Sequence, residues 1–121
     1  MFNEKIFNNG IKVSDSSCQS WNAHPLYRGV YMKNFLSARD TDNKISTHLV
    51  KIEPDCTIEL HVHPGKGELH EIIDGEGIAF VQEKNVDYRS GISSFIPADT
   101  PHSITAGANG LLLMAKFIPA L

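Results

Sequence analysis

Cysteine and net charge are both scarce in this sequence. Its 121 residues include two cysteines, Cys18 and Cys56, and neither belongs to a CxxC pair. In a reducing compartment we therefore expect two free thiols rather than a disulfide. The formal net charge of −3 gives no electrostatic reason to expect a nucleic-acid partner or binding to an anionic membrane.

Long hydrophobic runs are also absent. No apolar run approaches the ~20 residues of a membrane-spanning helix. The first residues, MFNEKIFNNG, lack the basic-then-apolar layout of a signal peptide. We therefore expect a soluble, cytoplasmic protein with no membrane partner. The length suits a single domain over residues 1–121 and allows a buried core without disulfides.

No segment of ten or more residues shows helical periodicity. Short apolar or alternating runs are instead separated by Gly, Pro, Asn and Asp, which is typical of an all-β sandwich or barrel. Asn9-Gly10 suits a type I′ turn, so residues 1–20 should form an N-terminal arm with a hairpin. The Gly-Glu-Gly at 75–77 should break a strand. Further strands are expected at 29–36, 45–52, 57–63, 68–74, 78–82, 86–89, 92–97, 102–106 and 110–118.

Two histidines lie two residues apart in TIELHVH, residues 57–63. Alternation along a strand places His61 and His63 on one face, with Cβ atoms about 6–7 Å apart, so both imidazoles can reach one ion. The other face carries Ile58, Leu60 and Val62 and is expected to pack against the core.

The PGKG segment then permits a reversal that returns the carboxylate of Glu68 to the two histidines. Two histidines and a carboxylate bind non-haem iron and also suit manganese, nickel, cobalt or zinc. Polar strands also commonly carry an HxH pair on their solvated face. A metal site and a polar strand both remain open at this point.

Residues 55–77 resemble the first motif of the cupin superfamily, G-x5-HxH-x3,4-E-x6-G. His61 and His63 form the HxH, four residues precede Glu68, and six more precede Gly75. Asp55 stands in place of the leading glycine.

Residues 91–106 resemble the second cupin motif, G-x5-PxG-x2-H-x3-N. Gly91, Pro97 and His102 match, whereas Asp99 and Ala106 replace the second glycine and the asparagine. The two motifs together identify the chain as similar to small, single-domain cupins.

The resemblance implies an all-β double-stranded β-helix, which is a small jelly-roll barrel, with one divalent transition metal ion near one mouth. The implied ligands are His61, His63, Glu68 and His102. Glu71 is an alternative to Glu68, although its strand parity and the motif spacing favour Glu68. Such an ion would leave open positions for water, oxygen or a bidentate small molecule.

Four further residues are candidates for a role beside the ion. His70 shares the face of Glu68 and is a candidate general base or hydrogen-bonding support. Glu59 shares the face of His61 and is a candidate catalytic or orienting group. Arg28 and His48 are candidates for substrate binding. The alternatives are a surface arginine and a structural, hydrogen-bonded histidine.

The expected function is a metal-dependent enzyme acting on an oxygen-rich small molecule, as a dioxygenase, isomerase, decarboxylase or lyase. The alternatives are a non-catalytic sensor or storage module and a structural cupin without a metal. Leu69 and Ile73 face away from the metal and favour a homodimer. Neither the metal (Fe, Mn, Ni, Zn or Co) nor the substrate follows from the motifs.

Overall fold

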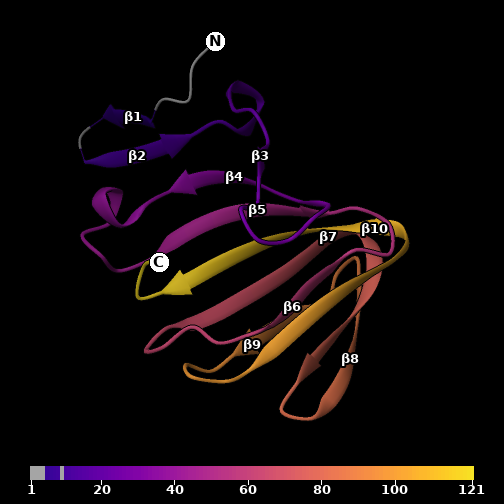
Figure 1. Cartoon of the computed structure of the whole chain (residues 1–121). Coiled ribbons are helices and arrows are strands. Elements are labelled where there is room, and N and C mark those ends of the chain that lie inside the picture. Colours follow the sequence, from indigo (N-terminus) through magenta and orange to yellow (C-terminus); the bar gives the residue numbers. More distant parts are fainter. Residues whose placement is uncertain (1–4, 9) are drawn as a thin grey trace.

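Ten β-strands and two one-turn 3-10 helices form the regular structure of residues 5–8 and 10–121, the part of the chain that the computed structural model describes (Figure 1). Within these residues no helix is long and apolar enough to cross a membrane. The helices are η1 (Ser16–Cys18) and η2 (Ala38–Asp40). The strands are β1 (Lys5–Asn8), β2 (Ile11–Ser14), β3 (Asn22–Ala23), β4 (Val30–Leu36), β5 (Ser46–Ile52), β6 (Thr57–His61), β7 (Gly67–Val81), β8 (Lys84–Arg89), β9 (Ser93–Ile96) and β10 (His102–Ile118).

The N-terminal hairpin is present, with β1 and β2 paired antiparallel in a sheet of their own. Gly10 has the positive φ of +83° that a tight turn requires. Asn9, the other residue of the expected turn, lies outside the described residues. Figure 1 shows this hairpin beyond β4, away from β8 and β9.

Two long strands, β7 and β10, organise the rest of the molecule, and Figure 1 shows β10 curving alongside β7. One half of β7 pairs with the C-terminal half of β10, which continues to β5, β4 and β3. The other half of β7 pairs with the N-terminal half of β10 and with β8, and β6 joins β10 there. Each long strand thus contributes to two antiparallel layers. This topology confirms the predicted all-β jelly roll.

The expected strand break at 75–77 is wrong, because β7 runs through this segment without ending. The glycines permit a bend instead. Gly75 has a φ of +80°, and a Cβ there would lie 2.1 Å from the carbonyl oxygen of Gly110. A side chain at Gly77 would meet the carbonyl oxygen of Thr105 at 2.5 Å. The two strands approach too closely here for any other residue, which is why the sequence resembles a turn.

The packing expected of the apolar residues of β6 is also wrong in part. Leu60 and Val62 are 60% and 43% exposed, whereas Ile58 packs against the core. The cause is a β-bulge: Ile58 pairs with Ile104 but His61 pairs with His102, so three steps on β6 oppose two on β10. The extra residue reverses the alternation between Ile58 and His61. As a result, both side chains line the same interior pocket.

The core fills the space between the two layers, and β5 shows the pattern. Ser46, His48, Val50 and Ile52 are buried, while the residues between them are half-buried. His48 therefore shares the interior face with Val50 and Ile52, as alternation predicts.

Candidate metal centre

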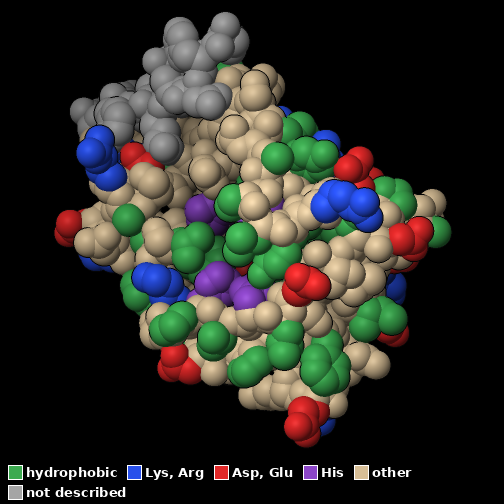
Figure 2. Space-filling model, in the orientation of Figure 1, with side chains coloured by type: hydrophobic (Ala, Val, Ile, Leu, Met, Phe, Trp, Pro, Cys, Tyr) green, Lys and Arg blue, Asp and Glu red, His purple; other side chains and the backbone are tan. Residues whose placement is uncertain are grey.

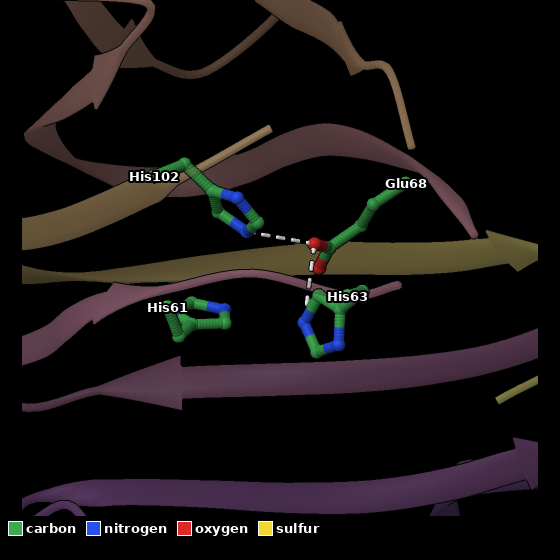
Figure 3. Close-up of side chains that lie close together, drawn as sticks. All are labelled: His61, His63, Glu68 and His102. Atoms are coloured by element: carbon green, nitrogen blue, oxygen red, sulfur yellow. Dashed lines mark hydrogen bonds and ion pairs between the residues drawn. The ribbon is translucent and has the colours of Figure 1, made fainter. Parts of the chain in front are cut away.

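His61, His63, Glu68 and His102 lie together inside the barrel (Figure 3). One potential ligand atom from each lies within 4.8 Å of those of the other three. These are the four residues that the motif resemblance implies. Glu68 and His102 are buried, and His61 and His63 are half-buried at the open side.

Three separate segments supply the cluster. The register of β6 with β10 sets His61 directly opposite His102. His63 lies two residues beyond the end of β6, in the turn that leads to β7. Glu68 is the second residue of β7, and its carboxylate Oε1 lies 3.0 Å from His102 Nε2 and 3.7 Å from His63 Nε2. The hairpin and a strand some forty residues further along thus meet at one point.

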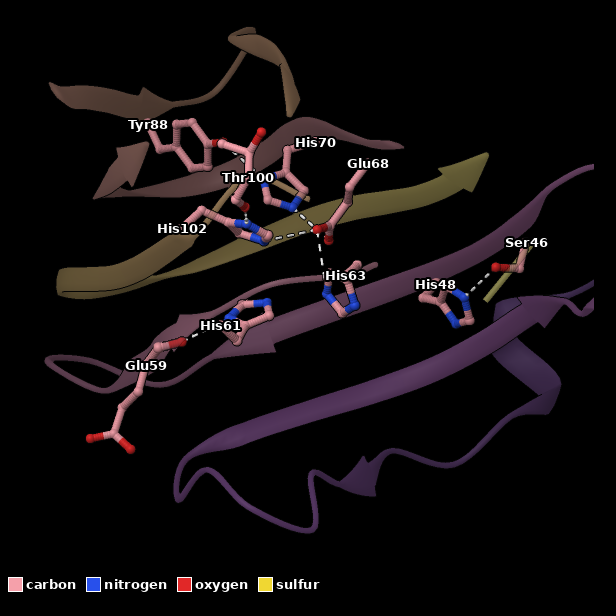
Figure 4. A network of polar contacts seen from close by, with 10 residues as sticks. All are labelled: Ser46, His48, Glu59, His61, His63, Glu68, His70, Tyr88, Thr100 and His102. Atoms are coloured by element: carbon pink, nitrogen blue, oxygen red, sulfur yellow. Dashed lines mark hydrogen bonds and ion pairs between the residues drawn. The ribbon is translucent and has the colours of Figure 1, made fainter. Parts of the chain in front are cut away.

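Two of the imidazoles are oriented by backbone carbonyls (Figure 4). His61 Nδ1 donates to the carbonyl oxygen of Glu59 at 2.7 Å, and His102 Nδ1 donates to that of Thr100 at 2.9 Å. A proton held on Nδ1 leaves Nε2 to face the cluster. Metal-binding histidines usually have such a partner, because it fixes the tautomer and the orientation of the ring.

The charges of the cluster favour an ionised carboxylate. Burial alone would raise the pKa of Glu68, but the hydrogen bonds and positive charge of His102 and His70 outweigh it and hold this pKa well below its usual range. Burial also acts to lower the pKa of His102, but its bonds to Glu68 and to the Thr100 carbonyl raise it. Burial lowers the pKa of His61 and His63, which favours their neutral form.

This donor set fits a divalent transition metal ion. Metal–ligand bonds of about 2.1 Å place neighbouring ligand atoms about 3 Å apart and opposite ones about 4 Å apart, which is close to the spacing observed here. A cation between His102 Nε2 and Glu68 Oε1 would replace the proton that these atoms now share. The cluster could therefore hold an ion through three nitrogens and one carboxylate.

His70 lies behind Glu68 rather than in the pocket. It is 1% exposed. Its Nε2 donates to Glu68 Oε2 at 2.8 Å, and its Nδ1 lies 2.8 Å from the hydroxyl of Tyr88. The two rings meet edge to face. His70 therefore fixes the second carboxylate oxygen of Glu68 and leaves Oε1 for the cluster.

The alternative ligand Glu71 is outside the cluster. Its carboxylate forms an ion pair of 2.7 Å with Lys116 and is 44% exposed. Strand parity separates it from Glu68, as the sequence predicts.

Glu59, Arg28 and Cys56 border a second pocket and do not line the metal pocket. Figure 4 shows the Glu59 carboxylate directed away from the cluster, so its backbone carbonyl and not its side chain orients His61. Arg28 is exposed. Cys56 and Cys18 are both free.

His48 does line the metal pocket, but both of its ring nitrogens are already bonded. Nδ1 lies 2.7 Å from Asn34 Oδ1, and Nε2 lies 3.0 Å from Ser46 Oγ. Burial lowers the pKa of His48 and keeps it neutral. The side chain therefore presents its ring, and no unpaired nitrogen, to the pocket.

Two important side chains were not identified from the sequence. Tyr88 is 1% exposed and supports His70, and Phe117 forms the floor of the pocket beside His63. Alternation along their strands could have indicated that both face inward, since Val86 and Tyr88 share one strand face, as do Ala115 and Phe117. Their partners across the barrel were not visible in the sequence.

Comparison with known proteins places this chain in a family. The chain matches the cupin domain family over residues 48–114, more than half of its length. It is 31% identical over 81 residues to an oxalate-binding protein of Thermotoga maritima, an alignment that covers 66% of this chain and 67% of that protein.

Solved structures show the same fold. A predicted oxalate decarboxylase of Thermotoga maritima superposes with a TM-score of 0.80 at 29% identity, covering 88% of this chain and 97% of that one. An RmlC-like cupin from Shewanella frigidimarina superposes with a TM-score of 0.76 at 16% identity, covering 88% of this chain and 89% of that one. The second likeness concerns the fold alone.

Proposed function

This chain belongs to the cupin family, and from that premise we propose that it is a metal-dependent enzyme acting on a small molecule with adjacent oxygen atoms. The observation that carries the proposal is the cluster of His61, His63, Glu68 and His102 beside a pocket of about 290 Å³. The pocket gives a small molecule access to the ion that these four side chains would hold.

The metal, when bound, would supply Lewis-acid chemistry by polarising a carbonyl or carboxylate oxygen of the ligand. The protein's own groups do the rest. His61 and His102 are held in orientation by the carbonyls of Glu59 and Thr100. Glu68 remains ionised, and His70 fixes its second oxygen. Apolar side chains such as Val50 and Phe117 exclude water from the ligand.

Non-catalytic binding of a small ligand is the second candidate function, and one observation favours it. The two groups expected to move protons do not line the pocket, because His70 is buried behind Glu68 and Glu59 borders a different pocket. The relative described as an oxalate-binding protein also points to a small-molecule ligand.

Metal content tests the site directly. Elemental analysis of the purified protein should find about one divalent transition metal ion per chain. The double variant His61→Ala/His102→Ala should lose it. The control is His24→Ala, because His24 borders the same pocket but does not belong to the cluster. Equal metal in all three proteins would mean that the proposed ligands are wrong.

Turnover separates the two candidate functions. The metal-loaded protein should be incubated with oxalate and with α-keto acids, while CO₂ release and oxygen consumption are followed. Turnover that disappears in His61→Ala/His102→Ala supports the enzyme. Ligand binding to the metal-loaded protein without any turnover would favour the binding module.

A further inference from the structure

The pocket beside the metal cluster has mostly hydrophobic walls. Met32, Val50, Ile58, Phe117 and Leu121 line it together with the cluster. They come from β4, β5, β6, β10 and the C-terminal segment. Figure 2 shows the histidine side chains (purple) set among hydrophobic ones (green) on this face. The polar atoms of the cluster therefore lie at one part of a cavity whose other walls are mostly apolar, apart from His24, Tyr27 and His48.

A series of rings leads away from the cluster. The ring of His63 lies 4.8 Å from that of His61 and 4.8 Å from that of Phe117, and Phe117 lies 5.5 Å from His48, each pair edge to face. Because both nitrogens of His48 are bonded to Asn34 and Ser46, this far end offers ring carbon rather than a hydrogen-bonding group. An apolar group of the ligand can pack against the ring of Phe117.

No lysine or arginine lines the pocket among the residues that the structure describes. Arg28 borders another pocket, and the ammonium group of Lys66 donates to the backbone carbonyl of Ala120 at 2.7 Å. A carboxylate placed away from the ion would lose its hydration without gaining a cationic partner, which is unfavourable. A second charged end on the ligand is therefore a poor match for these walls.

The pocket is also larger than a minimal chelator needs. Its volume of about 290 Å³ is near the lower end of pockets that enclose drug-sized ligands, about 300 Å³. Oxalate consists of two linked carboxylates and nothing else, so it would leave the apolar walls uncovered.

We propose that the ligand of this pocket combines two adjacent oxygens, which bind the ion, with one aromatic or branched aliphatic group that lies on Phe117. An α-keto acid with an aryl or branched alkyl substituent has this chemistry. The proposal rests on the metal-binding function above and assigns the specificity of that site to the apolar wall. It distinguishes this chain from a binder of oxalate itself.

Affinity measurements on the cobalt-loaded protein test this specificity. Three probes are compared by calorimetry: pyruvate, phenylpyruvate, which adds a phenyl group to the same chelating end, and oxalate. The visible spectrum of cobalt reports whether each probe reaches the ion. Burial of the phenyl ring should make phenylpyruvate bind about tenfold to a hundredfold more tightly than pyruvate. Oxalate, as a dianion, chelates free cobalt more tightly than pyruvate does, so each affinity is compared with that for the free ion. Oxalate should lose more of its free-ion affinity in the pocket than pyruvate does.

A pair of lysine variants tests the missing positive charge. Val62→Lys places an ammonium group at the pocket wall, at a side chain that is already 43% exposed. Ile78→Lys adds the same charge at a 47% exposed strand position outside this pocket. Val62→Lys should bind oxalate several times more tightly than the wild type, and Ile78→Lys should not.

The outcomes separate the two proposals. If cobalt does not bind, the metal-binding function is wrong and the proposed specificity falls with it. If cobalt binds but pyruvate matches phenylpyruvate, or oxalate keeps its full free-ion advantage over pyruvate, the specificity is wrong and the metal site stands. Equal effects of Val62→Lys and Ile78→Lys on oxalate would also overturn the specificity, because the pocket's lack of charge would then not be what excludes oxalate.

Discussion

At the scale of single residues, His70 shows how a buried polar group can serve a site that it does not enter. It joins Glu68 Oε2 to the hydroxyl of Tyr88, with both contacts at 2.8 Å and all three residues buried. The ring thereby satisfies two polar atoms that have no access to water. We therefore propose that His70 positions Glu68.

Substitution of His70 should therefore destabilise the protein and loosen the metal site. In His70→Phe, Glu68 Oε2 loses its partner and the Tyr88 hydroxyl keeps only its hydrogen bond with Ser94, at an expected cost of about 2–5 kcal/mol in the free energy of unfolding. Tyr88→Phe removes one hydroxyl and should cost about 1–3 kcal/mol. Urea denaturation measures both, and metal titration should show weaker binding in His70→Phe. Wild-type stability in His70→Phe would contradict this role.

Glu68 should make the metal-free protein sensitive to acid. Its folded-state pKa lies below the ordinary value of 4.5, because the bonds from His102 and His70 outweigh burial. The ionised carboxylate therefore stabilises the folded state above about pH 4.5, and this stability is lost as the pH falls toward the folded-state pKa. The free energy of unfolding, measured between pH 7 and pH 3 with a chelator present, should fall more steeply with decreasing pH in the wild type than in Glu68→Gln. Parallel profiles would argue against the low pKa.

At the scale of elements, the bulge in β6 decides which way the HxH pair faces. Strict alternation would place Ile58 and His61 on opposite faces, yet both line the pocket because one extra residue lies between their pairing partners. Deletion of Leu60, which is 60% exposed, removes the extra residue and leaves Ile58 and His61 two apart, so both should still face the pocket from a regular strand.

The deletion can be compared with one on the other side of His61. The variant lacking Leu60 should keep the β-sheet circular dichroism and the metal binding of the wild type. Deletion of Val62 instead makes His61 and His63 adjacent, so their rings point to opposite faces, and metal binding should weaken by at least tenfold. Loss of metal binding on deletion of Leu60 would contradict this account of the bulge.

At the scale of the whole molecule, the homodimer expected from the sequence stays a prediction. Ile73 is 46% exposed, as expected, and Leu69 is half-buried beside Phe95, itself 57% exposed. Light scattering at high micromolar concentration should give the mass of two chains. The variant Phe95→Ser should shift that mass toward one chain, whereas Ile78→Ser should not. A wild-type monomer would contradict the prediction.

Much of the candidate metal centre could be predicted from the sequence, because it depends partly on local spacing. Two histidines two residues apart point the same way in an extended segment, and a short turn can return Glu68 to them. His102 was identified only through the resemblance of residues 91–106 to a motif, since no local rule relates it to His61. The fold class likewise followed from strand periodicity and turn residues.

The sequence by itself determined the all-β fold class, the candidate ligand set of His61, His63, Glu68 and His102, and the parity that separates Glu68 from Glu71. Only the tertiary structure decided that β7 bends rather than breaks, that Ile58 joins the pocket through a bulge, and that His70 lies behind Glu68. It also decided that the pocket walls are apolar. The physical reason is range: alternation acts between neighbours along the chain, whereas register, close approach and burial depend on strands that are distant in sequence.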